Sequence, residues 1–344
     1  MAKSSVQFQK GMSLEEFQKN HGTEEQCWQS LFDLRWPKGF VCPRCGWHNG
    51  CAIRTRGVYQ CNRCHHQTSV TAGTIFHATK LPLRVWFLGI YLMTQTKNGI
   101  SVLELSRHLG ISFNAGWRMK HKLMQVMLER DNGKRIQGDI LLDDSYLGGE
   151  RSGGKRGRGA PGKTPFVIAV EMKKDQPVRI KLNRVARFSL IELERWSRHH
   201  LAPGSKVTSD GLDCFTMVTR AGCEHRQVIT GSGKKAAKHP VFQALNTVLG
   251  NLKNSFRGTY HSFHPKHAPR YLAEFQYRFN RRFDLGAMIP RLVYVGARTT
   301  PPRDIVKCCG FDGKDISTFG QYQAASFSTP SMKTTPPNSL RISK

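Results

Sequence analysis

The chain has 344 residues, enough for a sizeable core with one or two small accessory domains. Its 53 lysines and arginines outweigh 24 acidic residues, and the resulting charge of +29 repels itself unless it meets a polyanion, most commonly nucleic acid. No apolar stretch reaches the roughly 18 residues that span a membrane, and residues 1–10 lack the apolar run of a secretory signal. We therefore expect a cytoplasmic protein with no membrane partner.

Residues 1–38 are predicted to form a short helical lead-in. Ser13 is placed to cap a first helix, with Glu16 at its third position, and Thr23 with Gln26 marks the start of a second. Trp36-Pro37 ends this region.

Residues 39–72 contain two C-x2-C knuckles separated by 15 residues, formed by Cys42 and Cys45 and by Cys61 and Cys64. Each knuckle turns two thiolates to one side of a tight loop, and together they complete a tetrahedral site for one structural Zn²⁺ ion. Two redox dithiols are the alternative, but no thioredoxin-like βαβ context surrounds them. The pattern predicts a zinc ribbon.

Residues 74–131 are predicted to be helical, and residues 101–129 have the helix, glycine turn and helix of a helix-turn-helix. Polar and basic residues lie early in the second helix, and we expect them to contact DNA: Asn114, Arg118, Lys120 and Lys122. Asn114 and Arg118 are the candidates for reading base edges. An ordinary three-helix packing unit with a solvated basic face is the alternative.

Residues 136–285 change to an α/β pattern. Strands are predicted at residues 140–147, 165–172, 178–182, 206–209 and 227–230, and helices at residues 189–200, 240–256 and 269–283. A glycine-rich loop between the first two strands carries basic residues suited to a DNA backbone, namely Arg151, Lys155, Arg156 and Arg158. Residues 286–344 are expected to form a basic, partly flexible tail.

Acidic residues are scarce, so those beside predicted strands are informative. Asp143 and Asp144 interrupt the strand at 140–147, and Asp210 follows the strand at 206–209. A carboxylate at the middle of one strand and another at the end of a second can share two divalent ions, which support phosphodiester displacement. Oxygen ligands favour Mg²⁺ or Mn²⁺.

A third ligand is expected from the helix after Pro240, which contains no acid. Asn246 and Asn251 are the candidates. Lys253 lies seven residues beyond Asn246, so the two share one helical face, whereas Asn251 points away from it.

The chain resembles the ISXO-type insertion-sequence transposases from about Leu14 to Arg282. The resemblance rests on LRWPKGFVCPRC (residues 34–45), LDDSYLGG (142–149), SDG (209–211), NLKNSFRGTYH (251–261) and RYLAEFQYRFNRR (270–282). It implies a zinc ribbon, a helix-turn-helix and a ribonuclease-H-like catalytic domain, a mixed sheet with flanking helices.

The resemblance also implies a strand-cleaving and strand-joining enzyme that acts at the nucleoid on the terminal inverted repeats of its element and on target DNA. Asp143 matches the first acid of the family and Asp210 the second, while Asn246 stands at the third position, followed by Lys253. Synapsis of two ends implies a homo-oligomer.

Two other hypotheses stay open from the residues alone. A catalytically decayed transposase or zinc-ribbon regulator would bind the ends without cutting them, as the missing third carboxylate would allow. A zinc-ribbon RNA-binding or ribosome-associated protein would also account for the charge.

Overall fold

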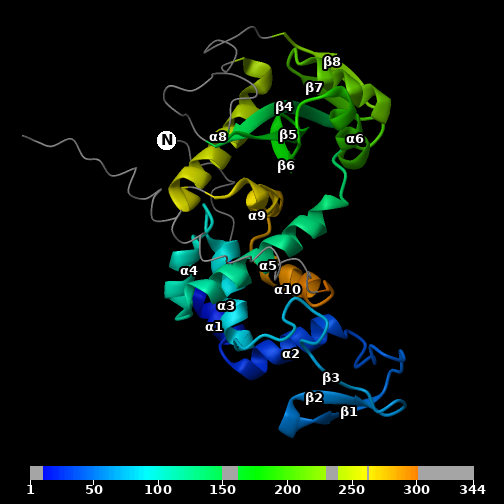
Figure 1. Cartoon of the computed structure of the whole chain (residues 1–344), viewed down its shortest axis with the longest axis vertical. Coiled ribbons are helices and arrows are strands. Elements are labelled where there is room, and N and C mark those ends of the chain that lie inside the picture. The colour runs from blue at the N-terminus through cyan, green and yellow to red at the C-terminus, as the bar shows by residue number, and fades with distance from the viewer. Residues whose placement is uncertain (1–10, 149–161, 230–238, 262, 301–344) are drawn as a thin grey trace, which may run out of the picture. The chain divides into compact units, whose positions relative to one another are not determined.

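The computed structural model describes residues 11–148, 162–229, 239–261 and 263–300, which fold around two β-sheets (Figure 1). The smaller sheet has the order β1-β2-β3 and the larger the order β6-β5-β4-β7-β8. The strands are β1 (Gly50–Ile53), β2 (Val58–Cys61), β3 (Gln67–Ser69), β4 (Asp139–Leu147), β5 (Thr164–Lys173), β6 (Gln176–Arg184), β7 (Lys206–Ser209) and β8 (Glu224–Gln227). The α-helices are α1 (Leu14–His21), α2 (Glu24–Arg35), α3 (Leu83–Gln95), α4 (Val102–Leu109), α5 (Phe113–Asn132), α6 (Leu190–His200), α8 (Gln243–Ser255), α9 (Ala268–Asn280) and α10 (Met288–Gly296).

The first two helices begin where their capping residues predict. The Ser13 hydroxyl accepts a hydrogen bond from the Glu16 backbone at 3.0 Å, and Thr23 forms a capping box with Gln26 at the start of α2. Helix α2 then packs against the ribbon through aromatic rings, with Trp28 stacked on Tyr59 at 5.8 Å between ring centroids. The ribbon therefore includes α2, whereas the sequence places that helix in a separate lead-in.

Helices α4 and α5 form the predicted helix, turn and helix. Gly110 makes the turn with φ of 63°, a left-handed conformation that favours glycine. The two helices approach closely at Gly116, where an added Cβ would lie 2.2 Å from the Ser106 hydroxyl oxygen. This contact sets how far apart the helices lie.

The larger sheet is mixed. Strands β4, β5 and β6 pair antiparallel, and β4 pairs parallel with β7, which pairs parallel with β8. Strand β8 lies at 224–227, so the strand predicted at 227–230 begins three residues too late. This is the ribonuclease-H-like mixed sheet with flanking helices that the sequence predicts.

The sheet is covered on both faces because successive side chains of β4 and β5 point to opposite faces and are apolar on each. Leu141 and Ile168 pack into the larger core with α8 and α9, whereas Leu142 and Val167 pack into a second core with α6 and the 3-10 helix η3 (Asp213–Ala221). Asp143 follows the alternation of Leu141 and so belongs to the face covered by α8.

Side chains of α9 form hydrogen bonds with the backbone groups of β6 that no neighbouring strand pairs. The Gln276 side chain accepts a hydrogen bond from the Leu182 backbone at 2.7 Å, and Asn280 bonds both the N–H of Ile180 at 2.7 Å and its carbonyl at 3.0 Å. Arg282, beyond the helix end, donates to the carbonyls of Val178 and Pro177. An exposed strand edge can pair with other chains, so this covering closes one side of the sheet.

The C-terminal helices pack against the N-terminal ones. Helix α9 contacts both α5 and β6, and α10 contacts α2, α3 and α5. Met288 and Leu292 in α10 are fully buried, so residues 288–296 belong to the core, although the sequence assigns them to a basic, partly flexible tail. Within the described residues, no helix is both long and apolar enough to cross a bilayer.

Candidate active site and zinc centre

Three aspartates meet where the middle of β4 lies beside the end of β7. The register aligns Leu142 of β4 with Ser209 of β7, so the next residues along the parallel pair, Asp143 and Asp210, lie side by side. Carboxylate oxygens of Asp143, Asp144 and Asp210 all lie within 4.8 Å of one another, and all three residues are half-buried. A half-buried cluster of carboxylate oxygens fits the preference of Mg²⁺ and Mn²⁺ for oxygen ligands.

Local hydrogen bonds orient two of these carboxylates. Asp143 Oδ1 accepts from the Asp144 backbone at 2.8 Å, and Asp210 Oδ1 accepts from the Leu212 backbone at 3.2 Å. The Ser209 hydroxyl is hydrogen-bonded to His225 Nε2 at 2.9 Å, which ties the end of β7 to β8. Neighbouring backbone groups and strands therefore hold the acids in place at the middle of β4 and the end of β7.

Asp144 is not among the ligands that the sequence predicts. Alternation along a strand places consecutive side chains on opposite faces, which argues against two adjacent acids sharing one site. Yet both belong to the cluster, because each residue offers one oxygen that lies close to Asp210. In the sequence, the only indication that Asp144 belongs to the cluster is its position next to Asp143.

Helix α8 brings a cation to the aspartates. Burial lowers the pKa of Lys253, and Asp143 acts in the opposite direction, which places the ammonium within the electrostatic reach of that carboxylate. Asn246 is half-buried seven residues earlier, whereas Asn251 is exposed. The two residues expected to share one face therefore share their burial as well.

The four ribbon cysteines converge as their spacing predicts. Cys42 Sγ lies 3.6 Å from Cys64 Sγ, Cys45 Sγ lies 3.6 Å from Cys61 Sγ, and all four sulfurs lie within 4.8 Å of one another. Sulfurs about 2.3 Å from one zinc ion lie roughly 3.8 Å apart in a tetrahedron, so this set fits Zn²⁺.

Each knuckle is closed by the same backbone turn. Gly46 N–H donates to the Cys42 carbonyl at 2.9 Å, and His65 N–H donates to the Cys61 carbonyl at 3.0 Å. Burial opposes ionisation of Cys61, but the backbone N–H groups of Cys64 and Arg63, with the neighbouring thiols, lower its pKa to about 7. The turn thus favours the thiolate that a metal ion binds.

Two of the four helix-turn-helix candidates are exposed. Asn114 and Arg118 lie one turn apart near the start of α5. Their side chains are available for contacts outside the chain.

Lys120 is a core residue, and the prediction that it contacts DNA is wrong. Its side chain is fully buried, with the ammonium 3.3 Å from the Glu274 carboxylate and 2.5 Å from the Ile100 carbonyl. Tyr260 completes the network by donating its hydroxyl to Glu274 at 2.7 Å. A buried ammonium with a carboxylate partner has no access to a phosphate.

Lys122 is half-buried. Its ammonium donates to the Ile75 carbonyl at 2.9 Å and lies 5.7 Å from the centre of the Trp86 ring. The predicted backbone-binding residues Arg151, Lys155, Arg156 and Arg158 lie outside the described residues.

Two comparisons with protein families identify relatives of both regions. Residues 135–280 match the ISXO2-like transposase domain, and residues 22–67 match the transposase zinc-ribbon domain. The first segment contains the aspartate cluster and α8, and the second begins just before α2, in agreement with the packing of that helix on the ribbon. The matches confirm the resemblance seen in the sequence motifs.

A curated relative is the "Uncharacterized protein in transposable element ISH50" of Halobacterium salinarum. It is 25% identical over 150 residues, which cover 41% of this chain and 49% of that protein. The chain thus spans about half the length of this relative.

Proposed function

We propose that this chain, whose residues 135–280 match the ISXO2-like transposase domain, binds the terminal inverted repeats of its element and catalyses metal-dependent DNA strand cleavage and strand transfer. The observation that carries the proposal is the convergence of Asp143, Asp144 and Asp210 beside Lys253 within the matched transposase domain. Acids are scarce in this chain, and the gathering of these three concentrates negative charge where a divalent cation would be held.

We assign the metal-binding role to Asp143, Asp210 and Asn246. Two Mg²⁺ or Mn²⁺ ions, when bound, activate the attacking oxygen and stabilise the leaving oxygen of a phosphodiester. Asp143 and Asp210 orient the site from two adjacent strands, and their backbone hydrogen bonds hold the carboxylates in place.

Lys253 is proposed to hold a phosphate oxygen of the bound DNA strand. Its half-buried ammonium lies within the field of Asp143, and partial burial strengthens its attraction for an anion. Asn246, on the same face of α8, would complete the oxygen ligands with its side-chain carbonyl.

The N-terminal region is proposed to recognise the DNA. One Zn²⁺ ion held by the four cysteines would stabilise the ribbon without taking part in chemistry, because four protein ligands leave no open position. Asn114 and Arg118 are exposed at the start of α5, the part of a recognition helix that meets base edges. A homo-oligomer would bring two element ends together.

A second candidate is a protein that binds element ends but does not cut them. The observation that favours it is the neutral amide of Asn246 where a third carboxylate would bind metal more tightly. DNA binding would then survive without strand cleavage.

Strand-transfer assays separate the two candidates. We would incubate zinc-loaded protein with a labelled duplex carrying the terminal repeat and its flank, with or without added Mg²⁺. We expect Mg²⁺-dependent nicked and joined products from the wild type, none from Asp143→Asn or Asn246→Ala, and wild-type yields from Asn251→Ala.

Binding to the same duplex is the control for folding and recognition. Asp143→Asn should bind the terminal repeat as tightly as the wild type when Mg²⁺ is withheld. A wild-type protein that binds the repeat but gives no product in Mg²⁺ or Mn²⁺ would refute the enzyme and favour the binding protein. Full activity of Asp143→Asn would refute the site.

A further inference from the structure

A basic pocket lies where α5 ends and meets β6, α9 and α10. Its volume is about 540 Å³, and its lining also includes the segment that joins α5 to β4. None of its lining residues belongs to the aspartate cluster or to α8. The pocket is therefore separate from the candidate active site.

Positive charge dominates the lining. Seven lysine and arginine side chains face a single carboxylate, that of Asp131. The Arg281 guanidinium forms a bidentate ion pair with this carboxylate, with N–O distances of 2.7 and 3.0 Å. Two more of the arginines pair with acids outside the lining, Arg179 with Glu171 and Arg291 with Asp284. An excess of four positive charges remains.

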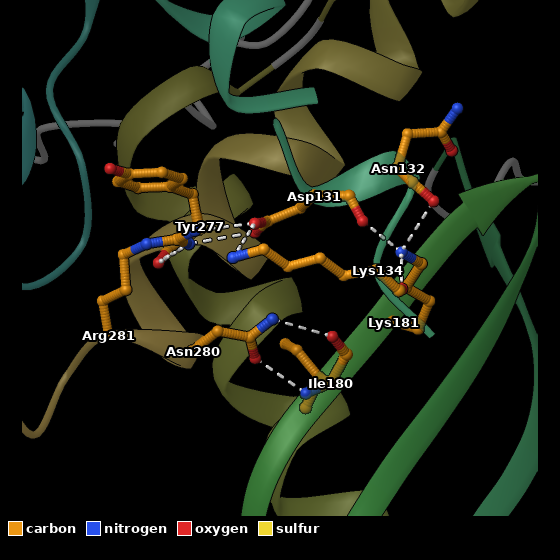
Figure 2. Close-up of polar contacts among 8 residues, drawn as sticks. All are labelled: Asp131, Asn132, Lys134, Ile180, Lys181, Tyr277, Asn280 and Arg281. Carbon is orange, nitrogen blue, oxygen red and sulfur yellow. Dashed lines mark hydrogen bonds and ion pairs between the residues drawn. The ribbon is translucent and has the colours of Figure 1, made fainter. Parts of the chain in front are cut away.

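The floor of the pocket is a preorganised network (Figure 2). Lys181 is almost fully buried, and its ammonium donates to the carbonyls of Asp131, Asn132 and Lys134, where the last carbonyls of α5 lack helical partners. Asn280 holds the neighbouring backbone of Ile180 through both its N–H and its carbonyl. These hydrogen bonds hold the Lys181 ammonium and the backbone around it in place, so the base of the pocket need not rearrange when an anion binds.

Two of the cations at the rim have no carboxylate partner in the part of the chain that the structure describes. Arg130 and Arg135 are exposed, and neither forms an ion pair within the described residues. Figure 2 shows Lys134 extending toward Asp131 and Arg281; its ammonium lies 3.9 Å from the Asp131 carboxylate, which Arg281 already engages, and 52% of its side chain is exposed. Partial burial lowers the pKa of Lys134, Asp131 opposes this shift, and nearby Arg281, Arg130 and Arg179 add to it. The pocket thus holds cations that repel one another, a cost that a bound anion would relieve.

We infer that this pocket is a second binding site for the phosphodiester backbone of DNA, distinct from the site of strand cleavage. Guanidinium groups present planar sets of donors that match phosphate oxygens, and the two arginines free of ion pairs lie on the open rim. This inference rests on the proposed function, because it takes DNA to be the substrate of the protein.

The position on α5 favours duplex DNA over a small anion. The same helix presents Arg118 near its start and Arg130 near its end, and 12 residues at about 1.5 Å each separate them by roughly 18 Å. A duplex rises by about 3.4 Å per base pair, so this separation corresponds to roughly five base pairs measured along a duplex axis. One helix would thus connect base reading with a backbone contact further along the same duplex.

Salt-dependent binding tests the pocket in the full-length, zinc-loaded protein with Mg²⁺ withheld. We expect Arg130→Ala/Arg135→Ala to weaken binding of a terminal-repeat duplex and of an unrelated duplex by the same factor. The slope of log affinity against log salt should fall by about 0.9 for each phosphate that the variant no longer neutralises. Unchanged affinity and slope would overturn the inference.

A matched control removes the same charge elsewhere. Arg195 and Arg220 are 77% and 63% exposed and lie on α6 and η3, which cover the other face of the sheet. Both pair with glutamates, so Arg195→Ala/Arg220→Ala should keep wild-type binding. An equal reduction of affinity in this variant would show a general charge effect and would overturn the inference.

Amine-reactive labelling locates the contact without any variant. Bound duplex should protect Lys134 of the wild type several-fold, while Lys174, exposed at the turn between β5 and β6, should remain reactive. Parallel experiments use inorganic phosphate or ATP at matched ionic strength in place of the duplex. Protection of Lys134 by these small anions but not by the duplex would overturn the assignment to DNA. Failure of the wild type to bind any duplex would instead refute the proposed function, whereas duplex binding with Lys134 unprotected would refute the pocket alone.

Discussion

Replacing Lys120 by methionine tests the buried charge network that joins α5 to α9. The substitution keeps most of the side-chain volume but removes the ammonium that lies 3.3 Å from the Glu274 carboxylate. Removing one partner of a buried ion pair costs roughly 3–5 kcal/mol, because the remaining charge is left uncompensated. We expect a value near 3 kcal/mol, since Tyr260 still donates to Glu274.

Thermal unfolding of the zinc-loaded protein measures this cost. A destabilisation of about 3 kcal/mol should lower the unfolding midpoint by about 6–12 °C in a domain of this size. The double variant Lys120→Met/Glu274→Leu should recover most of this stability, because it removes the uncompensated charge. Arg118→Met is the matched control, two residues earlier and exposed, and it should leave the midpoint unchanged while weakening DNA binding. A Lys120→Met protein with the wild-type midpoint and a reduced salt slope for DNA binding would refute the core assignment.

Three further predictions concern other parts of the fold. Removing zinc with a chelator, or Cys61→Ser, should unfold the ribbon and abolish specific DNA binding, as followed by near-UV circular dichroism and anisotropy. Burial lowers the pKa of His200 to about 3. Between about pH 6.5 and 3 this imidazole is protonated in the unfolded chain but neutral in the folded protein, so the free energy of unfolding falls as the pH drops below about 6.5. Relative to His200→Leu, the wild type should lose up to about 1.4 kcal/mol per pH unit between pH 6 and 4 in denaturant titrations. Asn280→Ala should cost about 1–3 kcal/mol, because it leaves the backbone of Ile180 without partners at the sheet edge, and hydrogen exchange at that amide should accelerate.

The features that sequence can predict depend on local geometry. A knuckle is a turn of a few residues, so the spacing of Cys42, Cys45, Cys61 and Cys64 is enough to group the four thiols. The apolar strands that contain Asp143 and precede Asp210 can be recognised because each is a short local run of β-prone residues. Ser13 and Thr23 mark helix starts because a cap bonds within its own first turn.

The features that sequence cannot predict depend on contacts between distant segments. Helical periodicity shows which residues of α5 share a face, but which face is covered depends on α9, far along the chain. The sequence therefore predicts an exposed Lys120, although Glu274 pairs with it in the core and neutralises its charge. For the same reason Met288 and Leu292 cannot be recognised as core residues, because their partners are N-terminal helices.

The covering of β6 by α9 has a consequence for how this chain can be divided. Helix α9 completes the hydrogen bonding of the sheet and packs on the long helix α5, so its side chains contact two regions at once. A chain cut between α5 and β4 would leave apolar surface of both pieces exposed. Helices α4 and α5 therefore cannot be exchanged as a separate unit, because a replacement would have to pack against α9 and α10 as well. If α5 reads DNA as proposed, a change of specificity is more accessible through the exposed side chains at its start.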